Sequence, residues 1–542
     1  MAYSDIPQVG QLTALLLAKG VRDIVVCPGS RNAPLVHNFH ATGERMRLHP
    51  LTDERSAAFA ALGISLATQE PAAVCVTSGS ALLNCLPAVA EAHYRHIPLL
   101  VISADRPPQW TEQGDGQTLP QAGALLPYCP TAQLHTPRTE EERWHNNRLI
   151  NEALSALETD CGGPAHINVP IEEPLFSFSA AELPAERVVG KISPAATSPL
   201  PAEVVRLIAE ARLPALFIGQ YERGDLRQTV ESLDADRQML VIPEVLSDVR
   251  GSFRANAFDT LSAGNDAAAL PDVIVHIGGN FVHKRFKSLL RENGCRVVRI
   301  GRDRRMTDTF CHLAYWVDSA PLPALVQLAR ELPHERESVK RAAAQLDAAW
   351  REERESLDRE AQATGTLSYH AVLLELRKAL SEEKETYALH LGNSTAVRAA
   401  SKVFEAGTFP VFCNRGTNGI EGSLSTAAGY ARAMWGKTVA VLGDLSFFYD
   451  ANALWSDSVP RGLHVLLLNN GRGAIFDTLA GLEKSPALPR YVAAGGTRLS
   501  AEGLCRTFGV GYHRAESQTE LAGKMRDWLA TDGAQLLEVC LP

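Results

Sequence analysis

The sequence predicts an α/β protein built from three Rossmann-like, doubly wound domains with largely parallel sheets. The chain has 542 residues, which is too long for a single hydrophobic core. Short apolar runs rich in β-branched residues alternate with helical stretches, as they do in βαβ units. A stretch rich in Ala, Pro and Ser and a long charged stretch divide these units into three groups. We expect domains at residues 1–180, 196–335 and 366–542, with the outer two similar in outline.

The composition is that of an ordinary globular protein, and it argues against several kinds of partner. Apolar residues make up 45% of the chain and charged residues 21%. The formal net charge of -9 argues against a surface for nucleic acid or for an anionic membrane. The N-terminus lacks a basic region, and no apolar run reaches the length of about 18 residues that spans a membrane. Ten cysteines without CxxC spacing are typical of a reduced compartment, so we expect a cytoplasmic protein.

Polar turns follow the predicted strands of the first domain. The strands are expected at Asp23–Cys27, Ala73–Thr77, Leu99–Ser103 and His166–Pro170. The turns contain Ser30 and Arg31, Asp53 to Arg55, Thr77 to Ala81, and Asp105 with Arg106. Because parallel strands end at one edge of their sheet, several polar turns there predict a binding site.

Glu54 stands out among these residues because it precedes the apolar helix that continues from Ala57. A glutamate in a poorly solvated pocket has a raised pKa and can share a proton with a basic ring nitrogen. The alternative is an ordinary first-turn glutamate favoured by the helix dipole. The residues alone leave both interpretations open.

The middle of the chain contains a linker, a second set of strands and a connecting helix. The linker is expected at Ala180–Pro201 and the charged helix at His334–Gln362, where opposite charges stand three or four residues apart. The strands are expected at Ala215–Ile218, Met239–Ile242, Val273–Ile277 and Arg296–Ile300.

The third domain carries a candidate metal site. Its strands are expected at Thr386–His390, Pro410–Cys413, Lys437–Leu442, His464–Leu468 and Gln535–Cys540, with a helix through Ala451–Trp455. Asp444 follows one strand and Asn470 follows the next, so a carboxylate and an amide oxygen should meet at the carboxyl edge. Such ligands suit Mg²⁺, and the carbonyl of Arg472 is a candidate third ligand. The alternative is an Asp that merely follows a buried strand.

Two Gly-rich turns and a set of basic residues indicate what the site binds. The turns, Gly392–Arg398 and Asn414–Gly422, allow backbone amides to approach phosphate oxygens. The basic residues are Arg31, Arg106, Arg398 and Arg415, with Lys284 and Arg285 from the middle domain. Arginine favours bidentate recognition of carboxylates, so we expect substrates with several carboxylates. The alternative is a set of surface arginines in weak ion pairs.

These motifs resemble those of the SEPHCHC synthase family of menaquinone biosynthesis, where SEPHCHC is 2-succinyl-5-enolpyruvyl-6-hydroxy-3-cyclohexene-1-carboxylate. The resemblance spans nearly the whole chain, through CPGSRNAPL, TDERSAAFAALG, TSGSALLN, ISADRPP, DGQTLPQ, GNSTAVR, NRGTNGIEGSLSTAAG and GDLSFFYD…NNGRGAIF. It implies the thiamine diphosphate-enzyme fold. It also implies decarboxylation of 2-oxoglutarate and addition of the resulting succinic-semialdehyde carbanion to isochorismate, with thiamine diphosphate and Mg²⁺ (or Mn²⁺) as cofactors.

The resemblance also implies residue roles. Glu54 would hydrogen-bond the aminopyrimidine ring, and catalysis would further involve Arg31 and Gln117. Asp444, Asn470 and the carbonyl of Arg472 would hold the metal. The other cofactor contacts would be Ser394, Ile420, Leu445, Ser446, Ile475 and Phe476. Isochorismate would meet Ser30, Arg31, Arg106, Gln117, Lys284 and Arg285, and the 2-oxoglutarate carboxylates would meet Ser394, Arg398 and Arg415.

The family implies a homodimer or a dimer of dimers whose active site lies between the first domain of one subunit and the third of another. Two positions depart from the family pattern. Gly116 stands where many relatives have Asn, so a polar contact is missing or comes from Asp115, and Arg472 with Ala474 interrupts a usual run of glycines.

Two other interpretations of the sequence are a different enzyme and a protein without catalytic activity. One is another thiamine diphosphate lyase, such as an acetohydroxyacid synthase or a 2-oxoacid decarboxylase, which would need fewer cationic groups. The other is a non-catalytic nucleotide-binding module, against which the joint presence of Glu54, Asp444 and Asn470 argues.

Overall fold

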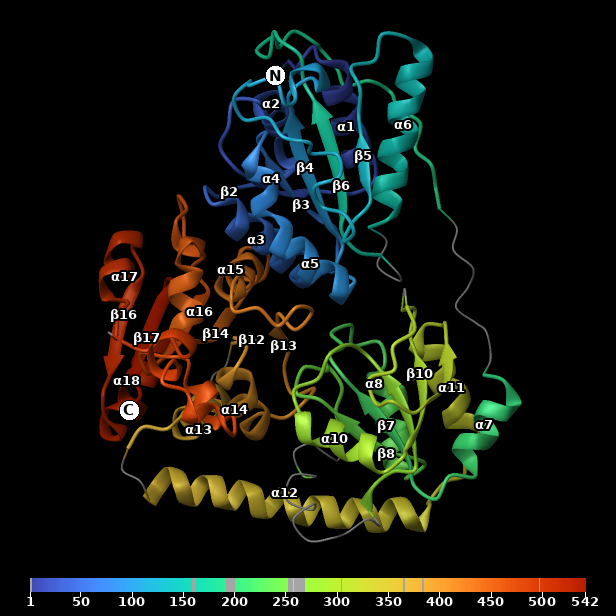
Figure 1. Ribbon diagram of the computed structural model, residues 1–542, viewed down its shortest axis with the longest axis vertical. Helices are drawn as coiled ribbons and strands as arrows, with labels where there is room; N and C mark the ends of the chain where they lie inside the picture. The colour runs from blue at the N-terminus through green and yellow to red at the C-terminus, as the bar shows by residue number, and fades with distance from the viewer. Residues whose placement is uncertain are drawn as a thin grey trace.

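The chain folds into three parallel sheets, each flanked by helices (Figure 1). The computed structural model describes residues 2–157, 162–191, 200–251, 257, 269–303, 305–363, 366–382, 385–496 and 498–542. The sheets have six, five and six strands in chain order. In Figure 1 the first sheet lies above, the second lies below it to the right, and the third lies below it to the left.

The first sheet has the strand order β2-β1-β3-β4-β6-β5. Its strands are β1 (Asp23–Val26), β2 (Arg47–Pro50), β3 (Ala72–Val76), β4 (Leu99–Asp105), β5 (Thr131–Gln133) and β6 (Ala165–Pro170). Its helices are α1 (Pro7–Ala18), α2 (Ala33–Ala41), α3 (Glu54–Thr68), α4 (Ser80–Asn84), α5 (Leu86–Arg95) and α6 (Glu140–Ser155). The central strands β3, β4 and β6 are buried along their whole length, as expected for a sheet covered on both faces.

The second sheet has the order β11-β10-β9-β7-β8. Its strands are β7 (Pro214–Ile218), β8 (Leu240–Pro243), β9 (Val273–Ile277), β10 (Arg296–Ile300) and β11 (Leu313–Val317). Its helices are α7 (Ala202–Ala209), α8 (Arg227–Ala235), α10 (Lys284–Glu292) and α11 (Pro321–Glu331). Helix α12 (Glu337–Ala363) then runs beneath the second and third sheets and joins them, as predicted (Figure 1).

The third sheet has the order β13-β12-β14-β15-β17-β16. Its strands are β12 (Tyr387–Leu391), β13 (Val411–Cys413), β14 (Lys437–Gly443), β15 (Leu463–Asn469), β16 (Gly511–Ala515) and β17 (Gln535–Cys540). Its helices are α13 (Tyr369–Glu382), α14 (Thr395–Val403), α15 (Ser423–Ala433), α16 (Asp444–Tyr449), α17 (Glu502–Phe508) and α18 (Gln518–Ala530).

The predicted α/β class and parallel sheets are confirmed, with a few corrections to individual elements. Four strands were not predicted, β2, β5, β11 and β16, and all are edge strands. The helix expected at Ala451–Trp455 is wrong, because the α-helix starts directly at Asp444 and Ala451–Leu454 forms only a 3₁₀ turn. Residues 192–199 of the predicted linker, and Cys161, lie outside the described residues.

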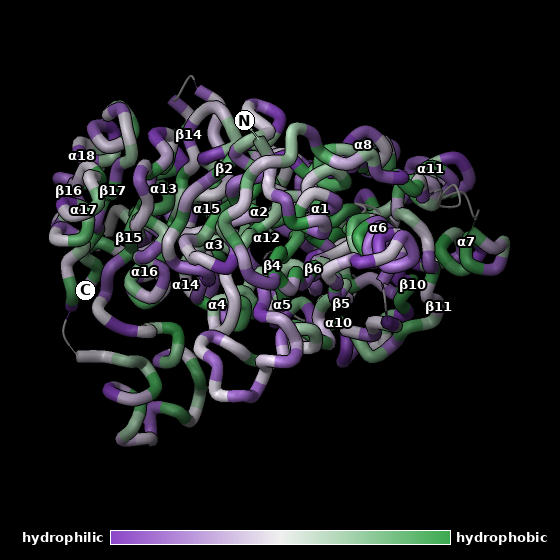
Figure 2. The backbone as a smooth tube through the Cα atoms, turned by 90° about the horizontal axis from the view of Figure 1, so that it is seen from above, coloured by the Kyte–Doolittle hydropathy of each residue, from purple (hydrophilic) through white to green (hydrophobic). Residues whose placement is uncertain are grey.

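Burial follows hydropathy throughout the molecule. In Figure 2 hydrophobic segments gather around the strands, whereas outer helices such as α6 and α11 carry hydrophilic turns. The cysteines among the described residues are free, and all of them except Cys311 are buried. Within the described ranges, no helix is both long and apolar enough to span a bilayer.

Helices α3 and α15 cross at very short range and join the first sheet to the third. A Cβ atom added at Gly63 would lie 2.0 Å from the carbonyl oxygen of Thr426. One added at Gly429 would lie 2.0 Å from the carbonyl oxygen of Ala60. Both glycines are therefore required by the close approach of the two helix backbones.

We predict that Gly63→Ala destabilises the protein, because the methyl group cannot fit without separating the helices, and overpacking of this kind costs about 1–3 kcal/mol. The measurement is the thermal unfolding midpoint. Gly503→Ala in helix α17 is the matched control, because nothing lies within 4 Å of its added Cβ. If Gly63→Ala were as stable as Gly503→Ala, the proposed tight crossing would be contradicted.

Candidate active site

Positively charged side chains gather at the carboxyl edge of the first sheet. Arg31 is only 6% exposed, and its Nη1 donates to the carbonyl of Ile171 at 3.0 Å. Burial, and secondarily the charge of Arg106, lower the pKa of the Arg31 guanidinium. Arg106 pairs with Asp115 at 3.0 Å. Two of the predicted basic residues, Arg31 and Arg106, therefore lie near each other here, and each pairs with a carboxylate, Glu173 at 3.4 Å for Arg31 and Asp115 for Arg106.

Gln117 and Ser30 are exposed on the same edge. The backbone of Gln117 adopts φ +56° and packs against Gly79, where an added Cβ would lie 3.2 Å from it. The amide of Gly79 donates to Gln121 Oε1 at 2.6 Å, which holds this turn in place. An added Cβ at Gly116 meets nothing within 4 Å, so the departure from the family pattern there leaves open space.

Glu54 is the first residue of α3, and its neighbours fix the start of that helix. The side chain of Asp53 accepts from the amide of Ser56 at 3.0 Å and caps the helix. Glu54 is partly exposed, and its Oε2 accepts from Asn84 Nδ2 at 3.1 Å. Its carboxylate is thus anchored yet still reachable from outside the chain.

Asp444 and Asn470 follow neighbouring strands at the carboxyl edge of the third sheet. Strands β14 and β15 are paired in parallel, with Gly443 opposite Leu468, so the residues that follow both strands are neighbours. Asp444 is 6% exposed. Burial raises the pKa of its carboxyl, whereas the backbone amides of Leu445, Gly471 and Arg472 act in the opposite direction.

The oxygen atoms available here fit a hard divalent cation. Asn469 is fully buried and its Nδ2 donates to Leu499 and Glu538, which leaves Asn470 as the more accessible amide. The carbonyl of Arg472 accepts from the amide of Ala474 at 3.0 Å and keeps a second lone pair. No group of three His, Cys, Asp or Glu side chains suits a metal in the described part of the chain. A metal at this edge would therefore rely on one carboxylate with amide and carbonyl oxygens.

The other predicted cofactor contacts lie in several segments of the third sheet's unit. Ser446 is buried and its Oγ donates to the carbonyl of Ile420 at 2.6 Å, which ties α16 to the second Gly-rich turn. Leu445 is partly buried beside them. Ile475 and Phe476 lie in a 3₁₀ turn, Ala474–Thr478, that comes shortly after Asn470 and Arg472. Ser394 caps α14 with φ +72°, a strained conformation for a residue other than glycine.

Arg415, which is buried, and Arg398, which is partly buried, bring two guanidinium groups close enough on this edge to affect each other's charge. Arg415 is 8% exposed, and its Nη1 donates to Asn393 Oδ1 at 3.1 Å and its Nη2 to the carbonyl of Phe281 at 3.2 Å. Burial, and then the charge of Arg415, lower the pKa of Arg398. Arg398 Nη1 and Arg415 Nε have no hydrogen-bond partner among the described residues. Two neighbouring cations that each keep an unpartnered N–H group are suited to binding an anion.

The remaining predicted contacts lie farther out. Lys284 and Arg285 are exposed at the start of α10. They belong to the same segment as Phe281, whose carbonyl accepts from Arg415, so the middle sheet reaches the edge of the arginine pair. Arg472 forms an ion pair with Asp477 through its side chain.

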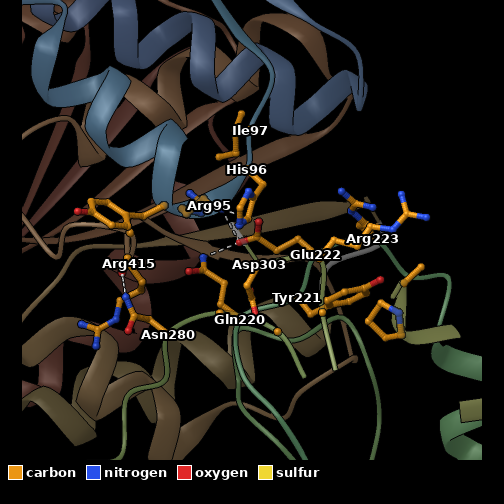
Figure 3. Close-up of a pocket in the computed structure, with 18 of the residues that line it drawn as sticks. Arg95, His96, Ile97, Gln220, Tyr221, Glu222, Arg223, Asn280, Asp303 and Arg415 are labelled. Carbon is orange, nitrogen blue, oxygen red and sulfur yellow. Dashed lines mark hydrogen bonds and ion pairs between the residues drawn. The ribbon is translucent and has the colours of Figure 1, made fainter. Parts of the chain in front are cut away.

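A cavity of about 240 Å³ borders Arg415 and lies between the first and second sheets (Figure 3). Its walls include Arg95, Gln220, Glu222, Asn280 and Arg415. Sequence reasoning missed Gln220, Asn280 and Asn393, whose neutral amides contact the segment around Arg415. It also missed Glu91, whose charge within the buried face of α5 was a detectable signal.

The architecture and a family profile place the chain among the thiamine diphosphate-dependent enzymes. Residues 8–124 match the family described as "Thiamine pyrophosphate enzyme, N-terminal TPP binding domain". The fold also resembles the crystal structure of benzoylformate decarboxylase from Polynucleobacter necessarius, with a TM-score of 0.72, 17% sequence identity and 98% of each chain covered. That likeness concerns the fold alone.

Curated relatives identify the family more closely. The chain is 37% identical over 549 residues to the 2-succinyl-5-enolpyruvyl-6-hydroxy-3-cyclohexene-1-carboxylate synthase of Bacteroides thetaiotaomicron, covering 99% of this chain and 96% of that protein. It is 38% identical over 534 residues to the synthase of Bacteroides fragilis, covering 97% and 93%. The chain belongs to the SEPHCHC synthase family, which confirms the resemblance seen in the motifs.

Asp450 provides a pH test of the packing next to this edge. It is fully buried and accepts from the amide and the hydroxyl of Ser425, each at 2.7 Å. Burial is the main cause that raises the pKa of Asp450 from 3.8 to about 6. The folded protein therefore binds this proton more tightly than the unfolded chain does, and stability should fall as the pH rises from about 4 to about 6.

We predict that Asp450→Asn, which cannot titrate, gains stability relative to the parent over this pH range by about 1.4 kcal/mol per pH unit. The measurement is the unfolding midpoint of both proteins at several pH values from 4 to 7. A difference that stays constant across the range would contradict the raised pKa.

Proposed function

We propose that this chain decarboxylates 2-oxoglutarate and adds the remaining four-carbon unit to isochorismate, giving SEPHCHC and CO₂ as its relatives' names imply. Family membership supports the reaction. The observation that carries the substrate assignment is the pair Arg398 and Arg415: the buried Arg415 donates to neutral acceptors, and Nη1 of the partly buried Arg398 has no hydrogen-bond partner among the described residues. Both substrates carry carboxylates, and a buried guanidinium recognises a carboxylate through charge-assisted hydrogen bonds. A cytoplasmic location agrees with the free, mostly buried cysteines.

Thiamine diphosphate supplies the carbanion chemistry when it is bound. Asp444, Asn470 and the carbonyl of Arg472 would hold Mg²⁺ or Mn²⁺ on its diphosphate. Glu54 would hold a proton at a ring nitrogen, and the apolar side chains Ile420, Leu445, Ile475 and Phe476 would wall the site, with Ser394 and Ser446 as polar contacts.

The two substrates would occupy different ends of the site. Arg398 and Arg415, with Ser394, would orient 2-oxoglutarate by its carboxylates. Arg31, Arg106, Gln117 and Ser30 would orient isochorismate at the edge of the first sheet, with Lys284 and Arg285 reaching in from the middle sheet. The assay that tests the reaction measures CO₂ release from 2-oxoglutarate with and without isochorismate. Release that is unaffected by isochorismate would argue for a simple decarboxylase instead.

We predict that Arg398→Ala raises the KM for 2-oxoglutarate by roughly tenfold or more and changes the KM for isochorismate much less. The reason is that a charge-assisted hydrogen bond in a buried site contributes about 1.5–3 kcal/mol. Steady-state kinetics with each substrate varied in turn provides the measurement. Equal increases in both KM values would contradict the division of the site.

We also propose that the site forms between two copies of the chain. Within one chain, the start of α3 lies against the end of α16, since Arg55 Nη2 donates to the carbonyl of Tyr449 at 2.6 Å and Asn452 donates to Asp53 at 2.6 Å. Asp444 lies at the other end of α16, about 7 Å from Tyr449 along the helix axis. The partly exposed Glu54 and the exposed Trp435, with 96% of its surface accessible, support a partner at this face.

A mixed dimer tests this arrangement. We predict that Glu54→Gln and Asp444→Ala are each inactive as homodimers, because the first removes the proton-holding carboxylate and the second the charged metal ligand. In a doubly tagged heterodimer one site would carry both substitutions and the other neither, so about half of the wild-type turnover should return. Turnover no higher than that of the inactive parents would show that each site is built within one chain.

A further inference from the structure

A buried carboxylate from the first sheet's unit accepts hydrogen bonds from the loop that carries Arg415. We call residues 414–419 the Arg415 loop. Glu91 of helix α5 accepts from the amide of Gly416 at 2.9 Å, from the amide of Thr417 at 2.8 Å and from the hydroxyl of Thr417 at 3.0 Å. A single side chain thus binds the two residues that directly follow Arg415.

The environment of Glu91 makes these contacts strong. The residue is fully buried, and a buried carboxylate is costly unless it is paired and hydrogen-bonded. Its nearest cation is Arg95, one helical turn later at 3.7 Å, and Arg95 is also bound by Glu222 of the middle unit (Figure 3). The loop amides therefore supply hydrogen bonds that Glu91 needs, and Glu91 in turn fixes the loop.

The loop has no room to move toward α5. A Cβ atom added at Gly416 would lie 2.8 Å from the carbonyl oxygen of Glu91 and 2.9 Å from its Oε2. Gly416 is thus required for the backbone to approach the carboxylate. The contact is a close fit of backbone against a buried charge, not a loose surface interaction.

The opposite side of the loop is held by neutral groups of the middle unit. Gln220 donates to the carbonyl of Cys413 at 2.8 Å, and Asn280 donates to the carbonyl of Arg415 (Figure 3). These bonds restrain the backbone before and at Arg415, whereas Glu91 restrains the backbone after it. Glu91 is the charged residue that binds the loop backbone, and Arg95, whose Nη1 donates to Asn414 Oδ1 at 3.4 Å, is the charged residue that reaches a loop side chain.

We propose that Glu91 is a positioning residue for 2-oxoglutarate, the substrate that donates the four-carbon unit, which we call the donor substrate. By holding Gly416 and Thr417 it keeps the guanidinium of Arg415 beside that of Arg398, where both face the carboxylate of 2-oxoglutarate. The inference rests on the donor-binding role proposed above for the two arginines. Glu91 does not touch the substrate, so its effect reaches the reaction through Arg415.

The direct test is Glu91→Gln, which keeps the side-chain volume but replaces one acceptor oxygen by an NH₂ group. This NH₂ would face loop N–H groups or Arg95, which are also donors. We expect the KM for 2-oxoglutarate to rise about tenfold, because one charge-assisted bond is lost and one donor is left unpaired. The KM for isochorismate should stay within about twofold, since its proposed contacts lie on another edge.

The matched control is Glu186→Gln. Glu186 also accepts from several donors, Gln11, Arg143 and Asn147, and its side chain is 5% exposed, but it contacts none of the residues of either substrate site. This variant should leave the ratio of the two KM values unchanged. A rise in the KM for 2-oxoglutarate with Glu186→Gln as large as that with Glu91→Gln would overturn the proposal, because it would reflect general loosening of the fold.

A double-mutant cycle separates positioning from a structural role. If Glu91 acts through Arg415, adding Glu91→Gln to Arg415→Ala should not raise the KM for 2-oxoglutarate any further. Fully additive effects would overturn the proposal. If Glu91→Gln does not fold, Thr417→Val removes one of the three bonds and should raise the same KM by a smaller factor, and an unchanged KM there would also overturn the proposal.

The KM values of these variants also distinguish a failure of the proposed role of Glu91 from a failure of the proposed function. If Arg398→Ala and Arg415→Ala both leave the KM for 2-oxoglutarate unchanged, the donor site itself is misplaced. If both raise it and Glu91→Gln does not, the donor site stands and the positioning role of Glu91 fails.

Discussion

Helices α3 and α15 approach each other so closely that backbone meets backbone at Gly63 and Gly429. The consequence extends to the site because both helices begin there. Helix α3 starts at Glu54, and α15 starts at Ser423, directly after the Gly-rich turn that carries Arg415 and Ile420. Since packed backbones cannot slide without losing contact along their whole length, the crossing fixes the orientation of the first sheet's edge relative to the third. The relative positions of Glu54 and the Gly-rich turn within one chain follow from that orientation.

On this rigid frame the protein places positive charge where solvation is poor. Arg31 and Arg415 are nearly inaccessible, and burial lowers the pKa of both Arg31 and Arg398. A buried cation is unfavourable unless an anion compensates its charge, so these arginines favour the binding of an anion. The neighbouring Asp444 is a buried carboxylate, so it favours the binding of a cation instead. The charges at this edge therefore agree with the proposal that a metal on a diphosphate binds there next to carboxylates of a substrate.

The central strands could be predicted from the sequence because they are buried on both faces and read as continuous apolar runs. Four edge strands, β2, β5, β11 and β16, could not, since they alternate or are half exposed and are set by pairing with a neighbour, whereas the buried edge strands β8 and β13 were predicted. Site residues that follow central strands, such as Asp444 and Asn470, were predicted for the same reason. Contacts between distant segments were not: nothing local to Asn393 or Gln220 indicates that they bind the Arg415 segment.

The Arg415 loop shows how a protein can fix a cation without neutralising it. The guanidinium donates to Asn393 Oδ1 and to the carbonyl of Phe281, both neutral acceptors, so its charge remains available to a ligand. The carboxylate of Glu91 instead binds the backbone that follows. Were that carboxylate on the guanidinium, it would orient the side chain equally well but would compete with the substrate. The carboxylate that holds the loop and the guanidinium proposed to bind the substrate thus act at different residues of one segment. Among the described residues of the middle unit, neutral amide and carbonyl groups form hydrogen bonds to this segment.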